Sequence, residues 1–158
     1  MPRQKRAKKT VAVIGYGSQG RAIALNLRDS GYSVVVGLRG RSKLRRTARN
    51  DGIDHITTIG RAVSDADIVC FAFPDHAHGR VFNKQIKPNL QTGCTLWFLA
   101  GMSVHFRLLT SPENCDVILI APHAPGITVR RKYLKKEAFS TFCAIYQNPS
   151  GRAQKTVV

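Results

Sequence analysis

The stretch from Thr10 to Gly20, TVAVIGYGSQG, most constrains the fold, because an apolar run ends in three glycines spaced G-x-G-x-x-G. In such a turn, Gly15 allows the sharp exit from a strand and Gly17 lets the backbone approach an anion. Gly20 lets the following helix pack closely on the strand. A helix that begins near Ser18 would direct its unpaired N–H groups and its positive dipole end towards that anion. An ordinary glycine-rich turn is the alternative.

The residues around the glycines favour a dinucleotide site over an ordinary turn. Residues 11–14 form a short apolar run of the kind found in buried parallel strands. A helical pattern follows the glycines and ends at Ser30. Its apolar face consists of Ala22, Ile23, Leu25 and Leu27. A second β run, SVVVG, follows over Ser33–Gly37. These elements fit within about 30 residues, the size of a βαβ unit, and predict a Rossmann-type fold.

The end of the second β run indicates which dinucleotide the site would take. NAD sites usually offer an Asp or Glu about 20 residues past the glycines, whereas a 2′-phosphate needs cations and hydroxyl donors. The segment after Gly37 contains no acid and reads LRGRSK. Arg39 and Ser42 are the predicted 2′-phosphate ligands, because guanidinium groups bind phosphate oxygens in pairs. Arg41 and Lys43 would add positive charge. NADP(H) is therefore the predicted cofactor, and a solvated basic turn is the alternative.

The rest of the chain alternates between strand and helix patterns. Short apolar runs predict further strands at Ile53–Thr57, Asp67–Phe73, Cys94–Leu99 and Asp116–Ala121. Helical patterns separate them at Ile59–Ser64, Asp75–Ile86 and Ser103–Leu109. A last apolar run, Phe139–Tyr146, would close an edge of the sheet. Together these elements predict an α/β fold with a doubly wound, mostly parallel sheet over residues 10–158, behind a basic flexible tail over residues 1–9.

Length and composition agree with one domain of this kind. A chain of 158 residues, 43% of them hydrophobic, can bury a core but is too short for two full domains. It contains neither the run of about 18 apolar residues that a membrane helix needs nor the apolar middle of a secretory signal. We therefore expect a soluble cytoplasmic protein. Four cysteines, each in or beside an apolar run, are expected to be buried free thiols, with neither a zinc knuckle nor a disulfide framework: Cys70, Cys94, Cys115 and Cys143.

The formal net charge of +16 suggests a second class of partner. Most of the basic residues lie in three clusters, Arg3–Lys9, Arg39–Arg49 and Arg130–Lys136. Such clusters release counterions from the phosphate backbone of a nucleic acid. No recognised nucleic-acid motif accompanies them. The middle cluster is instead expected to serve the 2′-phosphate, while the other two are solvated or touch an acidic partner.

Six stretches of the chain match the motifs of one known family: VAVIGYGSQGRAIALNLRDSGYSVVVGLRGRSK, ADIVCFAFPD, IKPNLQTGCTL, GMSVHF, VILIAPHAPGITVRRKY and AIYQNPSGRAQ. On these motifs, the chain resembles the N-terminal domain of ketol-acid reductoisomerase, an NADPH- and magnesium-dependent enzyme of valine and isoleucine synthesis. The resemblance implies a pyrophosphate loop within the glycine turn, at Gly15, Tyr16, Gly17, Ser18, Gln19 and Gly20. On the nicotinamide side, it implies contacts from Asp75, His76, Ala77, His78 and Gly126.

The chain departs from the family pattern at three positions. Where the family has a catalytic His before Gly-Phe, this chain has Ala100 before Gly-Met. Where the family reads Pro-Lys-Gly-Pro-Gly, the segment Pro122–Gly126 reads PHAPG. The imidazole of His123 can polarise an oxygen or move a proton near pH 7, so His123 is the catalytic candidate, with an ordinary surface or core histidine as the alternative. Leu44 replaces the family's second hydroxyl in the 2′-phosphate turn.

The resemblance also implies a helical C-terminal domain whose Asp and Glu residues bind two magnesium ions and the acetohydroxy acid substrate. We expect this chain to lack that domain, and its nine acidic residues include no paired set at the site. No metal site is predicted, and magnesium is expected only with a separate helical domain. A separately encoded chain of that kind, or a homo-oligomer, is an expected partner. Three functions remain: the cofactor-binding part of a ketol-acid reductoisomerase, incomplete as a catalyst alone; a non-catalytic NADP-binding module or truncated paralogue; and a basic nucleic-acid-associated protein.

Overall fold

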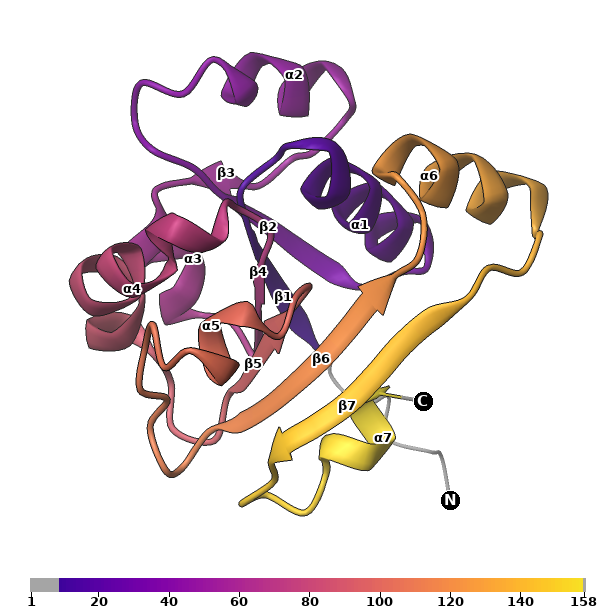
Figure 1. Ribbon diagram of the computed structural model, residues 1–158. Helices are drawn as coiled ribbons and strands as arrows, with labels where there is room; N and C mark the ends of the chain where they lie inside the picture. The colour runs from indigo at the N-terminus through magenta and orange to yellow at the C-terminus, as the bar shows by residue number, and fades with distance from the viewer. Residues whose placement is uncertain (1–8, 158) are drawn as a thin grey trace, which may run out of the picture.

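Seven strands form one sheet across residues 9–157, the part of the chain that the computed structural model describes (Figure 1). Their order is β3-β2-β1-β4-β5-β6-β7. Six strands run parallel: β1 (Thr10–Ile14), β2 (Ser33–Gly37), β3 (Ile56–Thr57), β4 (Ile68–Phe71), β5 (Thr95–Phe98) and β6 (Asp116–Pro122). The edge strand β7 (Thr141–Gln147) pairs antiparallel with β6. The predicted α/β fold with a mostly parallel sheet is confirmed.

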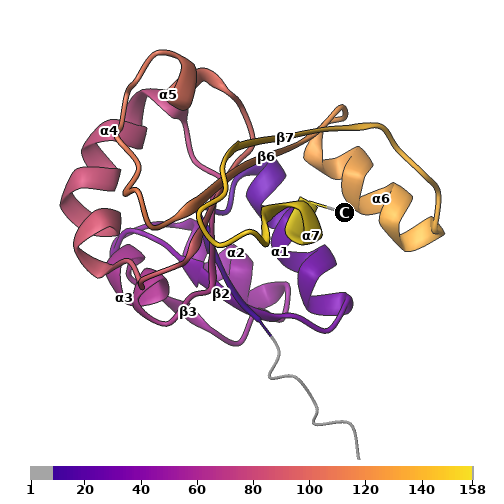
Figure 2. The same cartoon turned by 90° about the horizontal axis from the view of Figure 1, so that it is seen from below.

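Helices cover both faces of the sheet, because the central strands are apolar on both sides (Figure 2). In β1, Val11 and Val13 belong to one core with α1 (Ser18–Asp29), whereas Ala12 and Ile14 belong to a second core with α3 (Ile59–Ser64). Alternate residues of a strand point to opposite faces, so an unbroken apolar run fills both cores. The second core also receives side chains from the helical segment that follows β4.

That segment, predicted as one helix over Asp75–Ile86, is helical but irregular. It consists of a 3-10 turn (Asp75–Ala77), α4 (His78–Val81), a π-helical turn (Phe82–Ile86) and a second 3-10 turn (Lys87–Asn89). The π turn leaves both Phe82 and Ile86 fully buried. Pro88 lies at the start of the last turn and has no N–H to continue the ladder. The pattern therefore predicts the buried face correctly but not the winding.

Three further helices were not predicted from the sequence: α2 (Leu44–Asn50), α6 (Gly126–Lys135) and α7 (Ala153–Val157). Their apolar faces are too small to give a helical pattern. In α2 only Ala48 is buried, and in α6 only Gly126 and Val129 are buried. α6 instead lies beside α1 (Figure 1), where Arg130 donates to Asn26 Oδ1 at 2.9 Å and to Asp29 Oδ2 at 2.6 Å.

The last apolar run forms the edge strand, as predicted, but it is not a buried strand. Five consecutive residues of β7 are exposed, including Phe142 at 62% and Tyr146 at 68%. This corrects the expectation for Cys143, which is exposed because it lies in an edge strand whose residues 142–146 are all exposed. The other three cysteines are buried free thiols, as expected.

Across residues 9–157, none of the helices has the length and apolar character that crossing a bilayer would require. The predicted basic tail over residues 1–9 lies outside the described residues, except for Lys9.

Candidate cofactor-binding site

The glycine turn lies at the carboxyl end of β1, where the sheet order reverses. After β1 the chain builds β2 and β3 on one side, then crosses to β4 on the other side. Ligands of open α/β sheets bind at such switch points. Gly15 has φ +99°, and a Cβ there would overlap the Ala72 carbonyl of the loop after β4. At Gly20, a Cβ would come within 2.7 Å of the Gly15 carbonyl oxygen. Both glycines therefore permit close packing between α1 and the sheet.

Gly17 has a different role from the other two glycines. A Cβ at this position would meet no protein atom within 4 Å, so nothing in the fold itself requires glycine there. The space beside it is open. Gly17 is also the N-cap of α1, and among the described residues no side chain caps that helix. The first N–H groups of α1, from Ser18 onwards, thus lie at an open surface where a phosphate can approach.

The side chain of Tyr16 points away from this surface and is only 1% exposed. Its hydroxyl donates to Asp51 Oδ2 at 3.0 Å, and Arg21 donates to both carboxylate oxygens of Asp51, at 2.8 and 2.7 Å. The hydrogen bond from Arg21 lowers the pKa of Asp51, while burial raises the pKa of Tyr16. Tyr16 can therefore offer only its backbone to a ligand. The sequence did not point to Asp51, which locks the glycine turn to the end of α2.

Gln19 and Gly126 join the starts of α1 and α6. Gln19 Nε2 donates to the Ala124 carbonyl at 2.7 Å, and Gln19 Oε1 is buried with no hydrogen-bond partner among residues 9–157. A Cβ at Gly126 would overlap the backbone carbonyl of Ser18, so the two helix starts touch. Two positive helix ends consequently lie side by side at the carboxyl edge of the sheet.

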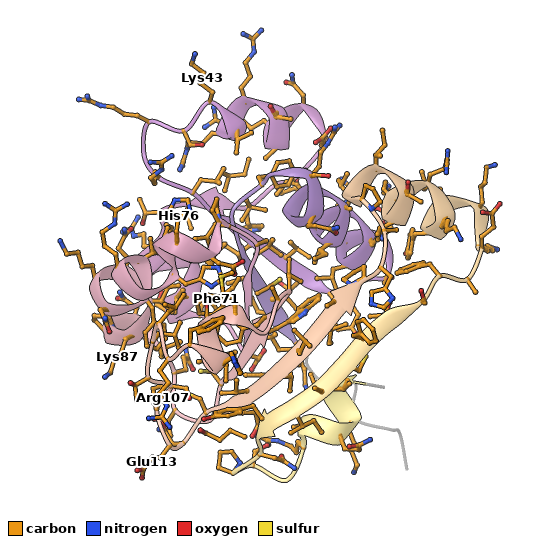
Figure 3. The ribbon with its side chains drawn as sticks, in the orientation of Figure 1. Lys43, Phe71, His76, Lys87, Arg107 and Glu113 are labelled. Atoms are coloured by element: carbon orange, nitrogen blue, oxygen red, sulfur yellow. The ribbon has the colours of Figure 1, made fainter. Side chains whose placement is uncertain are left out.

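The turn after β2 carries the residues predicted for the 2′-phosphate. Arg39, Arg41 and Lys43 are exposed, and Lys43 extends away from the sheet (Figure 3). The backbone N–H of Ser42 donates to the Arg39 carbonyl at 3.0 Å, which closes the turn. Ser42 Oγ accepts from the Leu44 N–H at 3.3 Å, and its hydroxyl meets no acceptor within the described part of the chain, so its hydrogen can be donated to a ligand. The turn therefore presents cations and a hydroxyl donor at the carboxyl end of β2.

Arg45, by contrast, does not face solvent with the rest of this basic cluster. Its guanidinium donates to the carbonyls of Thr57 at 3.1 Å, Ile56 at 3.3 Å and Leu38 at 3.4 Å. These carbonyls end β2 and β3, where the sheet ladder stops. One arginine of the middle cluster is thus structural, a role that sequence reasoning missed because the accepting carbonyls belong to other elements than α2.

Of the residues after β4 that were predicted to contact the nicotinamide side of the cofactor, only some lie at the surface. His76 is exposed and Asp75 is half-buried, whereas His78 is 1% exposed (Figure 3). His78 Nε2 lies 2.9 Å from the Phe73 carbonyl, and Nδ1 lies 2.6 Å from Ser103 Oγ. A carbonyl only accepts, so Nε2 carries the proton and Nδ1 accepts from the hydroxyl. Burial lowers the pKa of His78. Its side chain joins the loop after β4 to α5 (Met102–His105) and cannot reach a cofactor.

His123 follows β6 and is exposed. Its ring lies edge-on against Phe142, with centroids 3.7 Å apart, and Nδ1 is 3.4 Å from Ser140 Oγ. Ala100, which replaces the family's histidine, lines a cavity of about 400 Å³ together with Val104 and Tyr146. Over residues 9–157, no three His, Cys, Asp or Glu side chains are grouped so as to hold a metal ion.

The comparisons with known proteins point to one family. A family model described as "Acetohydroxy acid isomeroreductase, NADPH-binding domain" matches residues 6–158. The chain is 46% identical over 147 residues to the ketol-acid reductoisomerase (NADP(+)) of Pyrobaculum arsenaticum. It is 43% identical over 148 residues to that of Petrotoga mobilis. The matches cover 93% and 94% of this chain but 44% of each relative, so the chain spans less than half the length of these curated relatives.

Solved structures agree with this match. An NADH-preferring ketol-acid reductoisomerase from an uncultured archaeon has a TM-score of 0.88 at 38% identity, over 94% of this chain and 46% of that one. A putative oxidoreductase from Jannaschia sp. CCS1 has a TM-score of 0.76 at 20% identity, over 94% of this chain and 57% of that one, and shows the fold alone. From the match over residues 6–158, the chain belongs to the acetohydroxy acid isomeroreductase NADPH-binding domain family, with NADP(H) as its cofactor.

Proposed function

We propose that this chain binds NADPH across the carboxyl ends of β1, β2 and β4, as the cofactor-binding half of a ketol-acid reductoisomerase. Bound NADPH would supply a hydride for the reduction of a carbonyl. The observation that carries the proposal is the acid-free turn after β2, in which exposed Arg39 and the free hydroxyl hydrogen of Ser42 can hold the 2′-phosphate. The uncapped start of α1 and the open space at Gly17 fit the pyrophosphate.

The remaining predicted residues would take narrower roles. The backbone of Tyr16, Ser18 and Gln19 would donate to the pyrophosphate, since the Tyr16 side chain is held by Asp51. The unpartnered Oε1 of Gln19 is an acceptor for a donor group of the cofactor or a bound water. On the nicotinamide side, contacts would come from Asp75, His76, Ala77 and Gly126, and from the backbone of His78.

Catalysis by this chain alone is not supported by its residues. Ala100 cannot exchange a proton, and within residues 9–157 no cluster of ligands for magnesium is present. His123 is the one exposed residue of the PHAPG segment that can transfer a proton, and it keeps its candidate role. Reduction of an acetohydroxy acid would therefore need a helical partner domain that brings carboxylates to the site. A non-catalytic NADP-binding module is the second candidate, favoured by Ala100.

An exposed apolar face marks where such a partner would bind. It is formed by α5 (Met102–His105) with the residue after it, and by the side of β7 that carries Phe142 and Tyr146. Met102, Phe106, Phe142 and Tyr146 are at least 48% exposed. Contiguous apolar patches of this kind usually mark an interaction site. The curated relatives are more than twice as long as the matched region. The helical part of such a relative is therefore the proposed occupant, with a second copy of this chain as the other outcome.

The cofactor proposal is tested by comparing Arg39→Ala with a matched control, Arg152→Ala, in calorimetric titrations with NADPH and NADH. Arg152 is exposed and precedes α7, far along the chain from the turn. Loss of a charge-assisted contact to phosphate should cost about 1.5–3 kcal/mol, or about 10- to 150-fold in Kd for NADPH. NADH binding should change little in either variant. Equal NADPH affinity in the two variants would remove Arg39 from the site.

A further inference from the structure

Two of the buried cysteines lie side by side at the amino ends of neighbouring strands. β5 and β6 pair with Thr95 opposite Asp116, so the preceding residues, Cys94 and Cys115, are also neighbours across the ladder. The Asp116 N–H donates to the Cys94 carbonyl at 3.0 Å. The two sulfur atoms are 3.2 Å apart, and the residues are 2% and 1% exposed. This end of the sheet is opposite to the proposed cofactor site.

We propose that Cys94 and Cys115 form a dithiol that is oxidised to an intramolecular disulfide by peroxides or by small-molecule disulfides. Adjacent strands lie about 4.8 Å apart, and a disulfide joins residues whose Cα atoms are about 4.4–6.8 Å apart. The sulfur atoms need to approach by only about 1 Å to reach bonding distance. No shift of the strand register is required. The inference does not depend on cofactor binding.

The chemistry is balanced with hydrogen peroxide as the two-electron oxidant. The Cys115 thiolate attacks one peroxide oxygen and becomes a sulfenic acid, while the other oxygen leaves as hydroxide and takes up a proton as water. The Cys94 sulfur then attacks the Cys115 sulfur and displaces the second water, losing its own proton. With a small-molecule disulfide, the thiolate forms a mixed disulfide first, and Cys94 displaces the small thiol.

Two features identify Cys115 as the attacking thiol. The hydrogen bond between the two thiols lowers the pKa of Cys115 and raises the pKa of Cys94. Burial and the neighbouring Asp116 carboxylate act in the opposite direction on Cys115. Cys115 also ends a surface loop in which Arg107 and Glu113 point outward (Figure 3). Local opening of that loop would admit a small oxidant.

The other two cysteines provide internal controls. Cys70 is fully buried in the core on the α1 side, and burial alone raises its pKa. It should stay reduced in the folded protein. Cys143 is exposed on the edge strand, so its oxidation should join two chains instead of closing one. A Cys143→Ser variant removes this competing reaction without altering a buried side chain.

The test exposes the reduced Cys143→Ser chain to hydrogen peroxide, and separately to oxidised glutathione. Trypsin cleaves after Lys84, Arg107 and Arg130, so Cys94 and Cys115 fall in different peptides. We expect a monomer with one free thiol after denaturation, a mass loss of about 2 Da, and a linked peptide pair that separates on reduction. The crosslink should raise Tm by several degrees. Cys94→Ser and Cys115→Ser should abolish the linked pair, and Cys70→Ser should keep it.

A second treatment refolds the unaltered chain in a glutathione redox buffer. The thiols are then exposed to oxidant before the core forms, so slow entry of oxidant into the folded protein cannot prevent disulfide formation. A linked pair formed there and in the folded protein supports the proposal. Cys94 and Cys115 recovered as free thiols, or as separate glutathione adducts, after both treatments would overturn it. A link from either residue to Cys70 would overturn it as well.

Discussion

The half of the sheet around β1 and β2 differs from the half around β6 and β7 in how far its large side chains are buried. Around β1 and β2, α1 packs on the two strands, and even Tyr16 of the glycine turn is enclosed with a hydrogen-bond partner. Around β6 and β7, large apolar side chains such as Phe142 and Tyr146 are exposed, and Ala100 stands where the family has a histidine. The proposed cofactor half is therefore enclosed within this chain, whereas the half around β6 and β7 keeps an exposed apolar surface, the proposed site of a helical partner.

The largest expected effect comes from Gly126→Ala, which tests whether the starts of α1 and α6 pack closely in the cofactor half. The new methyl group would overlap the Ser18 backbone carbonyl, and neither backbone can move without separating α6 from α1. We expect a loss of about 2–4 kcal/mol in the free energy of unfolding, measured by urea titration. Gly101→Ala is the control, because its Cβ would meet open space at an ordinary φ of −75°. Equal stability of the two variants would contradict the close contact of the two helix starts.

Asp51→Asn should have the next largest effect. The change weakens the paired contacts from Arg21 and the hydrogen bond from the buried Tyr16 hydroxyl. Because Arg21 is half exposed, most of the cost comes from Tyr16, and we expect about 1–2 kcal/mol in chemical denaturation. Glu137→Gln is the control, since its ion pair with Lys135 spans 3.9 Å at the surface. If the two variants were equally stable, the hydrogen bonds from Tyr16 and Arg21 to Asp51 would not contribute to the stability of the fold.

A smaller, pH-dependent effect is expected from His78. Burial lowers its pKa in the folded state, so between that pKa and about 6.5 the unfolded chain binds more protons. Stability should therefore fall as pH drops below about 6.5, by no more than about 1.4 kcal/mol per pH unit for one proton. His78→Gln should flatten this part of the stability profile between pH 7 and 5. His123→Gln, which changes an exposed ring, should leave the profile unchanged. If the slope were also unchanged in His78→Gln, the pH dependence of stability would come from a group other than His78.

The smallest effect should come from Tyr146→Ser, which probes the incomplete half. Its side chain is 68% exposed, so we expect less than about 0.5 kcal/mol change in thermal unfolding. Phe71→Ser, at a fully buried position of the other half, should instead prevent folding. A large loss of stability in Tyr146→Ser would show that β7 is already covered, for instance by a second copy of the chain.

Local patterns made the cofactor half predictable from the sequence. The glycine spacing and the apolar runs of β1 and β2 depend on neighbours in the chain, and the acid-free turn with Arg39 lies directly after β2. Asp51 and Arg45 could not be found in this way, because their partners come from other elements. The helices α2 and α6 were missed because they dock with few apolar side chains. The exposure of Cys143 was unexpected because an apolar run in the sequence does not distinguish a strand that another element covers from one that stays exposed.

Calorimetric titration of the unaltered chain with NADPH and with NADH tests the central claim most directly, because the two differ only in the 2′-phosphate. The turn with Arg39 and Ser42, which follows the strand paired with β1, predicts that NADPH binds at least about 10-fold more tightly. It also predicts that this advantage shrinks as salt is added, since the contact is charged and exposed. Equal affinities for the two cofactors, or no binding of NADPH at saturating concentration, would contradict the account.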